Sequence, residues 1–146
     1  ILIGNCKVGK TSLLNFIVGR KGGGKEPTPT IGVEYAPVVL RVGSSDVRVN
    51  IWDTSGAEKY LSITRNYYRR SHGAIVIFDI TDRRYALSNA VASGPADGLA
   101  EIKDQIRDKM PKMIIANKMD LVESGQRERV VSENRSLISV WSTTSL

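Results

Sequence analysis

A glycine-rich segment near the start of the chain, Gly4–Thr11, carries the clearest signal of a binding site. Its letters GNCKVGKT fit the pattern G-x-x-x-x-G-K-[S/T], with a strand expected before it and a helix after it. Glycines let such a loop curl, so that its backbone N–H groups and the positive end of the helix bind phosphate oxygens. We expect a nucleotide phosphate site made of Gly4, Asn5, Cys6, Lys7, Val8, Gly9, Lys10, Thr11 and Ser12.

Two side chains of this loop add to the backbone donors. Lys10 would reach the β- and γ-phosphates, and the Thr11 hydroxyl would ligate Mg²⁺. The alternative is a chance match in a glycine-rich turn, because the pattern fixes only four positions; the strand and helix on either side weigh against it. The motif by itself does not choose between an ATPase, a kinase and a GTPase.

A second motif, Asn117-Lys118-Met119-Asp120, follows directly on the apolar run Met113–Ala116. A carboxylate such as Asp120 accepts from guanine N1–H and the 2-amino group together. Adenine lacks that donor pair, and a buried Asp left unpaired costs about 1–3 kcal/mol or more. Asn117 can bond N7 and brace the phosphate loop, and the stem of Lys118 can lie along the base. The motif therefore favours guanine and opposes a kinase or ATPase, the alternative being a solvated turn.

Further segments extend this pattern almost from end to end. In chain order they read TIGVEY, RVNIWDTSGAEKY, LSITRNYYRR, AIVIFDITD and, after NKMDL, TSL. Together with the phosphate loop they resemble the Ras superfamily of small GTPases, and the Rab branch in particular. The resemblance implies a switch that binds GTP and GDP with Mg²⁺, hydrolyses GTP slowly and recruits effectors in vesicle traffic.

The resemblance also implies roles for residues outside the two motifs. Thr30 matches the switch I threonine, whose side chain ligates Mg²⁺ and whose N–H touches the γ-phosphate. Asp53 and Gly56 match the D-x-x-G motif, in which the Asp binds Mg²⁺ and the Gly N–H contacts the γ-phosphate. Loss of that phosphate releases both segments. The implied metal ligands are Thr11, Thr30 and Asp53, and the implied catalytic groups are Lys10, Thr30 and Gly56.

Two further sets of residues match the family. Thr144-Ser145-Leu146 resembles the T-S-A loop, so Ser145 and Leu146 are implied to contact guanine O6 through the backbone. Tyr35, Trp52 and Tyr67 fall where Rabs keep three aromatic residues that face effectors. The alternative is that these aromatics are partly buried, and both can hold, because a ring can pack while its edge recognises a partner.

The chain departs from the family pattern at three places. Ala57 stands where a glutamine usually orients the attacking water, so we expect very slow hydrolysis. The segment Lys21–Lys25, with its triple glycine, lacks the aromatic residue that covers guanine; such stacking is worth about 1–3 kcal/mol per base. Nucleotide is therefore expected to exchange fast. Lys7 replaces a small residue, and we expect its side chain to point to solvent.

Strands and helices alternate along the chain, which predicts an α/β fold with a mostly parallel sheet. The resemblance specifies a P-loop GTPase G domain: six strands, one of them antiparallel, with helices on both faces.

The predicted elements between the motifs are as follows. A helix is predicted at Thr11–Val18, a loop at Arg20–Pro29, and an interrupted helix at Tyr85–Met110 with an insertion at Ala92–Gly98. The predicted strands are Ile1–Ile3, a hairpin of Val38–Val42 and Val47–Trp52, then Ala74–Phe78, Met113–Ala116 and Leu137–Trp141. Ala74–Phe78 and Met113–Ala116 are continuous apolar runs, which indicates burial on both faces. Only about Val131–Arg135 is available for a helix before the last strand.

Length and composition bound the remaining possibilities. The 146 residues predict one domain, 1–146, which looks trimmed at both ends because it starts with Ile1 and stops within the TSL motif. The net charge is +6, but the basic residues are scattered along the sequence, and their densest cluster is Arg65, Arg69 and Arg70. We therefore expect no nucleic-acid partner. No apolar stretch of this sequence could span a bilayer, and we expect no signal peptide. Cys6 is the one cysteine, which excludes an internal disulfide framework.

The overall expectation is a monomeric, cytoplasmic Rab-like GTPase. An exchange factor, an activating protein and effectors would be its partners. It would be peripheral on endomembranes through a lipidated C-terminal tail that this sequence does not contain. The alternative is a degenerate GTP-binding interaction module without significant hydrolysis. Ala57 and the triple glycine favour that alternative, and the intact metal-linked set opposes it: Lys10, Thr11, Thr30 and Asp53.

Overall fold

The computed structural model describes residues 1–20, 28–57, 60–82 and 110–130, and the fold is discussed for these ranges. Several predicted features lie outside them: the triple-glycine segment, most of Tyr85–Met110, the insertion Ala92–Gly98, the helix near Val131–Arg135 and the strand Leu137–Trp141. The elements in order are β1 (Leu2–Ile3), α1 (Lys10–Ile17), β2 (Val33–Val42), β3 (Ser45–Thr54), α2 (Leu61–Tyr68), β4 (Ala74–Asp79), β5 (Lys112–Asn117) and α5 (Met119–Glu123).

The described strands form one sheet in the order β2-β3-β1-β4-β5. β2 pairs antiparallel with β3, and the other neighbouring pairs are parallel. This topology confirms the predicted α/β class, with a mostly parallel sheet and one antiparallel strand. In the part of the chain that the structure describes the sheet has five strands, and the predicted sixth is not among those residues.

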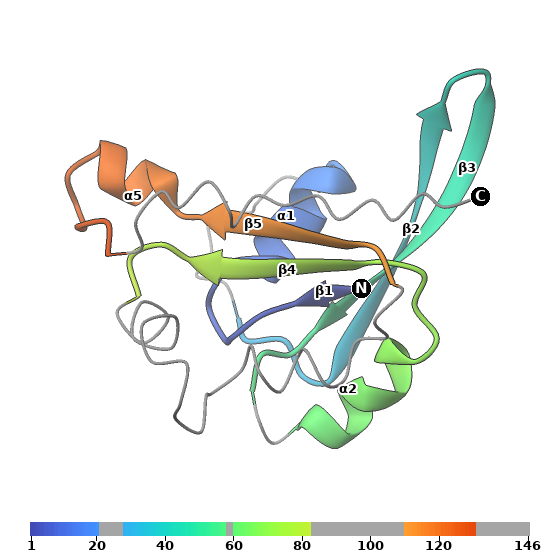
Figure 1. The fold of residues 1–146 in the computed structure, drawn as a ribbon, viewed down its shortest axis with the longest axis horizontal. Coiled ribbons are helices and arrows are strands. Elements are labelled where there is room, and N and C mark those ends of the chain that lie inside the picture. Colours follow the sequence, from blue (N-terminus) through green and yellow to red (C-terminus); the bar gives the residue numbers. More distant parts are fainter. Residues whose placement is uncertain (21–27, 58–59, 83–109, 131–146) are drawn as a thin grey trace.

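Helices cover both faces of the sheet, as Figure 1 shows for α1 and α2. Successive residues of a strand point to opposite faces of the sheet, so the two residues of β1 pack in different hydrophobic clusters. Leu2 packs with Leu14 of α1 in one cluster, together with Ala36 and Ile51. Ile3 packs with Tyr68 of α2 in the other cluster, whose further buried members are Ala74, Val76 and Met110.

The β2–β3 hairpin is longer than the sequence predicted. Its strands pair continuously from Val33 opposite Thr54 to Val42 opposite Ser45, so only Gly43 and Ser44 are left for the turn. Gly43 takes a φ of 60°, which glycine adopts without strain and which tight two-residue hairpin turns require. The tip of the hairpin extends beyond the rest of the sheet (Figure 1).

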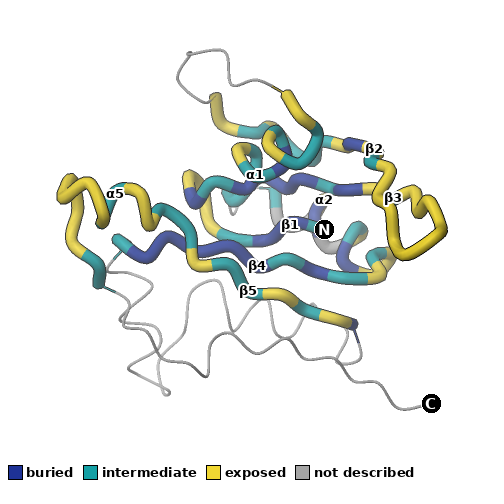
Figure 2. The backbone as a smooth tube through the Cα atoms, turned by 90° about the horizontal axis from the view of Figure 1, so that it is seen from above, coloured by how far each residue is buried: buried dark blue, intermediate teal, exposed yellow. Residues whose placement is uncertain are grey.

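Burial distinguishes the two strands that were predicted to lie inside the sheet. β4 is buried along almost its whole length, as expected from its continuous apolar run. The prediction was wrong for β5: none of its residues is buried, and Met113 is 46% exposed. The reason is position, because β5 is the last strand of the described sheet and has a sheet neighbour there only on the β4 side. Figure 2 shows the contrast between the two strands.

The helices differ from prediction mainly in number. The predicted helix at Thr11–Val18 lies at Lys10–Ile17, one residue earlier. α2 was not predicted from the sequence, and the α5 segment was predicted only as a loop after a strand. Among the described residues no helix is both long enough and apolar enough to cross a bilayer.

The two large apolar side chains of α1 predict a stability test. Leu14 is fully buried in the core, whereas Phe16 on the same helix is 83% exposed. We expect Leu14→Ala to lower the free energy of unfolding by about 2–5 kcal/mol, because it leaves a cavity. Phe16→Ala should change the free energy of unfolding by less than about 0.5 kcal/mol. Equal losses in urea titrations of the two variants would contradict the packing described for this helix.

Candidate functional site

The loop between β1 and α1 lies against the carboxyl ends of β4 and β5. A Cβ atom at Gly4 would collide with the backbone carbonyl of Ile77 in β4, and one at Gly9 would collide with the side-chain amide of Asn117 in β5. Their φ angles of 149° and 102° also lie in the region that favours glycine. These two positions therefore accept only glycine, which is the physical reason for their place in the motif.

Lys10 folds back over this loop. Its ammonium group donates hydrogen bonds to the carbonyl oxygens of Gly4 (2.7 Å) and Asn5 (2.8 Å). The residue is buried, and burial lowers the pKa of Lys10, although the nearby charge of Asp53 acts in the opposite direction. The first turn of α1 thus presents a largely desolvated cation at the backbone of the loop.

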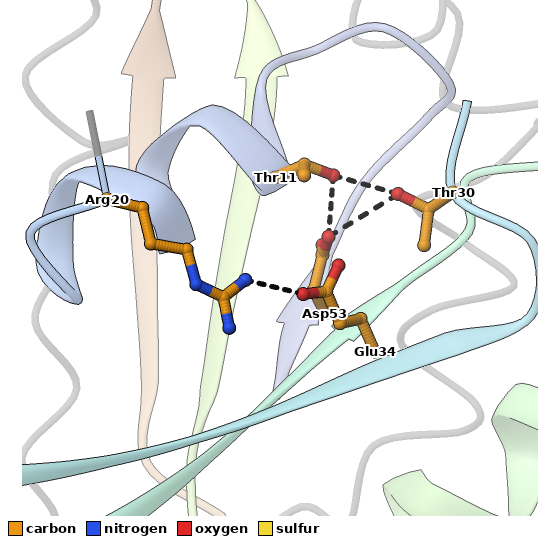
Figure 3. Close-up of polar contacts among 5 residues, drawn as sticks. All are labelled: Thr11, Arg20, Thr30, Glu34 and Asp53. Atoms are coloured by element: carbon orange, nitrogen blue, oxygen red, sulfur yellow. Dashed lines mark hydrogen bonds and ion pairs between the residues drawn. The ribbon is translucent and has the colours of Figure 1, made fainter. Parts of the chain in front are cut away.

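Three oxygen-bearing side chains from different segments meet beside the start of α1 (Figure 3). The Thr11 hydroxyl donates to Asp53 Oδ2 at 2.6 Å and lies 2.8 Å from the Thr30 hydroxyl. The Thr30 hydroxyl also donates to the same carboxylate oxygen, at 3.5 Å. The three residues predicted as metal ligands are therefore in mutual contact.

One carboxylate oxygen of Asp53 has no hydrogen-bond partner among the described residues. Its side chain is fully buried, and Oδ1 has no hydrogen bond within the described residues. Burial raises the pKa of Asp53, and the hydrogen bond from Thr11 and the charge of Lys10 offset this only in part. Buried charges normally require a partner. Carboxylate and hydroxyl oxygens are ligands that suit Mg²⁺ completed by water and phosphate, so these residues fit that ion.

The segment after Thr30 is joined to the end of β3. Gly32, with a φ of 71°, accepts a hydrogen bond through its carbonyl from Ser55 N–H at 2.8 Å. Arg20, just after α1, forms an ion pair with Glu34 at the start of β2, 2.7 Å apart. Both groups of that pair are exposed, so it contributes little to stability.

At Gly56 the D-x-x-G turn lies in close contact with the phosphate loop. A Cβ atom there would collide with the backbone of Asn5 and Cys6. The neighbouring Ala57 is partly buried, and its N–H donates to the Ser55 hydroxyl at 3.3 Å. The Ala57 side chain is a methyl group and offers no polar atom to this region.

Asn117 at the end of β5 connects the second motif to the first. Its side-chain amide donates to the Val8 carbonyl at 2.7 Å, so the predicted brace between the two loops is present. Asp120 lies in the first turn of α5 and is exposed. This exposure follows from its place on a short helix that has no buried residue, and the base contact of Asp120 stays a prediction.

Lys118 is held by a residue that the sequence analysis did not single out. Lys118 has a φ of 70°, and its ammonium group lies 2.7 Å from Asp79 Oδ2. The other oxygen, Oδ1, accepts from the N–H (2.8 Å) and the hydroxyl (2.7 Å) of Thr81. Burial alone would raise the pKa of Asp79, but the hydrogen bonds from Lys118 and Thr81 lower it below its usual value. An Asp closing a buried strand, with Thr two residues on, was the available sequence signal.

The three predicted aromatic residues form a continuous row. The ring centroids of Tyr35 and Trp52 are 4.8 Å apart, as are those of Trp52 and Tyr67. The Tyr35 hydroxyl donates to Asn50 Oδ1 at 3.0 Å. Tyr35 is 41% exposed and the other two rings are partly buried, so the row packs on the sheet while remaining accessible.

Other predicted site residues are exposed or lie beyond the described ranges. Cys6, Lys7 and Ser12 are exposed, which confirms the expectation for Lys7. Lys7 has a φ of 66°, a conformation uncommon outside glycine. Ser145 and Leu146 lie outside the described residues.

Comparison with known sequences identifies the class. The sequence model of the Ras family matches residues 1–140. The chain therefore belongs to the Ras family, whose fold has the sheet and phosphate loop described above.

Relatives place the chain within that class as a Rab-like small GTPase. Ras-related protein Rab11D of Lotus japonicus is 40% identical over 121 residues, covering 83% of this chain and 52% of the relative. Ras-related protein Rab-25 of Bos taurus is 34% identical over 143 residues, covering 94% and 63%. The human EF-hand calcium-binding domain-containing protein 4B is 33% identical over 140 residues, covering 92% and only 18%. The chain thus spans less than two thirds of these relatives.

The close approach at Gly56 predicts a selective effect of one methyl group. We expect Gly56→Ala to lower the free energy of unfolding by about 1–3 kcal/mol, because the turn must move away from the phosphate loop. Gly73→Ala is the matched control, since a Cβ atom there would lie 3.6 Å from the Pro111 carbonyl oxygen, an ordinary contact. Its effect should stay within about 0.5 kcal/mol. A Gly56→Ala variant as stable as Gly73→Ala in denaturant titrations would rule out the tight contact.

Proposed function

We propose that this protein is a GTP- and GDP-binding molecular switch that hydrolyses GTP slowly with Mg²⁺. The observation that carries the proposal is the meeting of Thr11, Thr30 and Asp53, with one buried carboxylate oxygen left unpaired. A scaffold without a ligand would gain nothing from a buried carboxylate oxygen that has no hydrogen-bond partner among the described residues, because such an atom costs stability. Membership of the Ras family agrees with this proposal.

The proposed chemistry is in-line attack of water on the γ-phosphate of GTP. Backbone N–H groups of the loop from Gly4 to Ser12 would bind the phosphate oxygens. Lys10 would exchange its two carbonyl partners for the β- and γ-phosphates, and the N–H groups of Thr30 and Gly56 would contact the γ-phosphate. Mg²⁺ held by Thr11, Thr30 and Asp53 would neutralise charge that develops on the phosphates.

The switching step would follow from loss of the γ-phosphate. Thr30 and Gly56 would both lose a partner, and the segments that carry them are joined by the hydrogen bond between Gly32 and Ser55. We therefore propose that the two segments relax together, as an order-to-disorder change. Effectors would bind the ordered form through these segments and the aromatic row of Tyr35, Trp52 and Tyr67.

Guanine specificity would come from the second motif. Asp120 would accept from N1–H and the 2-amino group, Asn117 would contact N7, and the stem of Lys118 would lie along the ring. The backbone of Ser145 and Leu146 would meet O6. Exposure of Asp120 and partial exposure of Lys118 leave both accessible to a base.

The cellular role that we propose is regulation of vesicle traffic. The protein would act as a monomer at the cytoplasmic surface of endomembranes, anchored by a lipidated tail beyond residue 146. An exchange factor would load GTP and an activating protein would stimulate hydrolysis. The proposal draws on the Rab-like relatives, named Ras-related proteins Rab11D and Rab-25.

The base contact of Asp120 is tested by changing its hydrogen-bonding pattern. We expect Asp120→Asn to shift preference from GTP toward xanthosine triphosphate by about 100-fold or more, because xanthine has a carbonyl oxygen where guanine has the 2-amino group. The new side-chain N–H group would donate to that oxygen, while the amide oxygen would still accept from N1–H. Glu123→Gln is the control, since Glu123 is exposed on the same short helix. The measurement is competition between the two nucleotides for each variant. Retention of GTP preference in Asp120→Asn would remove Asp120 from the base site.

The methyl side chain of Ala57 is tested in the chemical step. We expect Ala57→Gln to raise the single-turnover rate of GTP hydrolysis about tenfold or more, because the amide can orient water in the transition state. GTP affinity should change little, since the added interaction acts on the transition state. Ala57→Met, similar in length but without an amide, is the control. Equal rates for the Gln and Met variants at the same Mg²⁺ concentration would refute this role for position 57.

A further inference from the structure

Asp79 and Lys118 are brought together by the register of two parallel strands. Asp79 closes β4 directly opposite Asn117, the last residue of β5, and Lys118 follows Asn117 in sequence. The Ile80 N–H donates to the Asn117 carbonyl at 3.2 Å, which extends the contact past the end of both strands. The two side chains therefore leave neighbouring strands at the same edge of the sheet.

The carboxylate of Asp79 is fully engaged. One oxygen lies 2.7 Å from the Lys118 ammonium group, and the other accepts two hydrogen bonds from Thr81. The Asp79 side chain is only 8% exposed, compared with 25% for Lys118. Because Thr81 fixes the carboxylate from the far side, the position of the negative charge is set by β4 and not by the lysine.

The ion pair with Asp79 restricts the long side chain of Lys118. Its four-carbon stem carries large rotamer entropy, and its backbone has the left-handed φ of 70° that non-glycine residues rarely adopt. The ion pair anchors the far end of the stem, and Asn117 anchors the backbone on the near side through Val8. With both ends held, the methylene groups between them are ordered before any ligand arrives.

We propose that Asp79, supported by Thr81, is a positioning residue for guanine binding that holds Lys118 so that its stem forms a rigid wall of the base site. This inference rests on the proposed function of Lys118. Binding is strengthened when the cost of ordering a flexible group is met in the free protein. Asp79 would thus affect nucleotide retention without touching nucleotide, and only through Lys118.

A double-mutant cycle on GDP release tests the inference. We expect Asp79→Asn to speed GDP dissociation in the presence of Mg²⁺ by about tenfold, the scale of losing a charge-assisted hydrogen bond. In a Lys118→Met background, which keeps an apolar stem but removes the ammonium group, Asp79→Asn should change the rate by less than about twofold. Asp46→Asn is the control, because Asp46 pairs with Arg41 on the exposed hairpin, remote from this edge.

The outcomes separate this inference from the proposed function. If wild-type protein retains GDP and Asp79→Asn releases it at the wild-type rate, the inference is wrong and the proposed function stands. The same acceleration by Asp79→Asn in both backgrounds would mean a general loosening of the fold, and would also overturn it. Wild-type protein that binds no guanine nucleotide would overturn the proposed function, and this inference with it.

A milder variant keeps the test decisive if Asp79→Asn unfolds. Thr81→Val removes one of the two hydrogen bonds that fix Asp79 but leaves the ion pair in place. It should speed GDP release about twofold to fivefold, and again only when Lys118 is present. An unchanged rate in Thr81→Val, with the fold intact by circular dichroism, would contradict the inference.

Discussion

The carboxylate of Asp53 is fully buried near the end of β3 and contacts side chains from two other segments. It lies beside the first turn of α1. Its Oδ2 atom accepts hydrogen bonds from the hydroxyl groups of Thr11 and Thr30, which belong to separate segments. The other oxygen has no hydrogen-bond partner among the described residues. A buried carboxylate with a free oxygen beside two hydroxyl groups fits the proposed cation, which gives physical meaning to the motif.

The remaining geometry follows from parallel strands that end at one edge. β1, β4 and β5 run in the same direction, so the loop after β1 and the turn after β5 meet there. Gly4 and Gly9 let the phosphate loop approach the neighbouring strands more closely than any side chain would permit. Asn117 then joins the two loops through one hydrogen bond to Val8. The proposed phosphate site and the proposed base site are thus joined by this hydrogen bond.

Much of this arrangement could be predicted from the sequence, because its signals are local. The glycine pattern of the phosphate loop, the apolar run of β4 and the alternation of β3 each reflect a nearby physical requirement. What was missed depends on partners distant in the chain. The exposure of Met113 depends on which strand lies beside β5, and the role of Asp79 depends on a register that puts it opposite Asn117. The exposure of Asp120 follows from the short helix α5, whose five residues carry too weak a periodicity to detect.

Trp52 and Asp53 are consecutive residues of β3, so they point to opposite faces of the sheet. Asp53 meets the oxygen cluster beside α1, whereas Trp52 stacks between Tyr35 and Tyr67 on the face covered by α2. A single peptide unit therefore separates the candidate cation site from the indole ring. The alternation of a β-strand thus places an aromatic ring of the surface row and a carboxylate of the oxygen cluster on adjacent residues, so a shift of β3 at this point would move both.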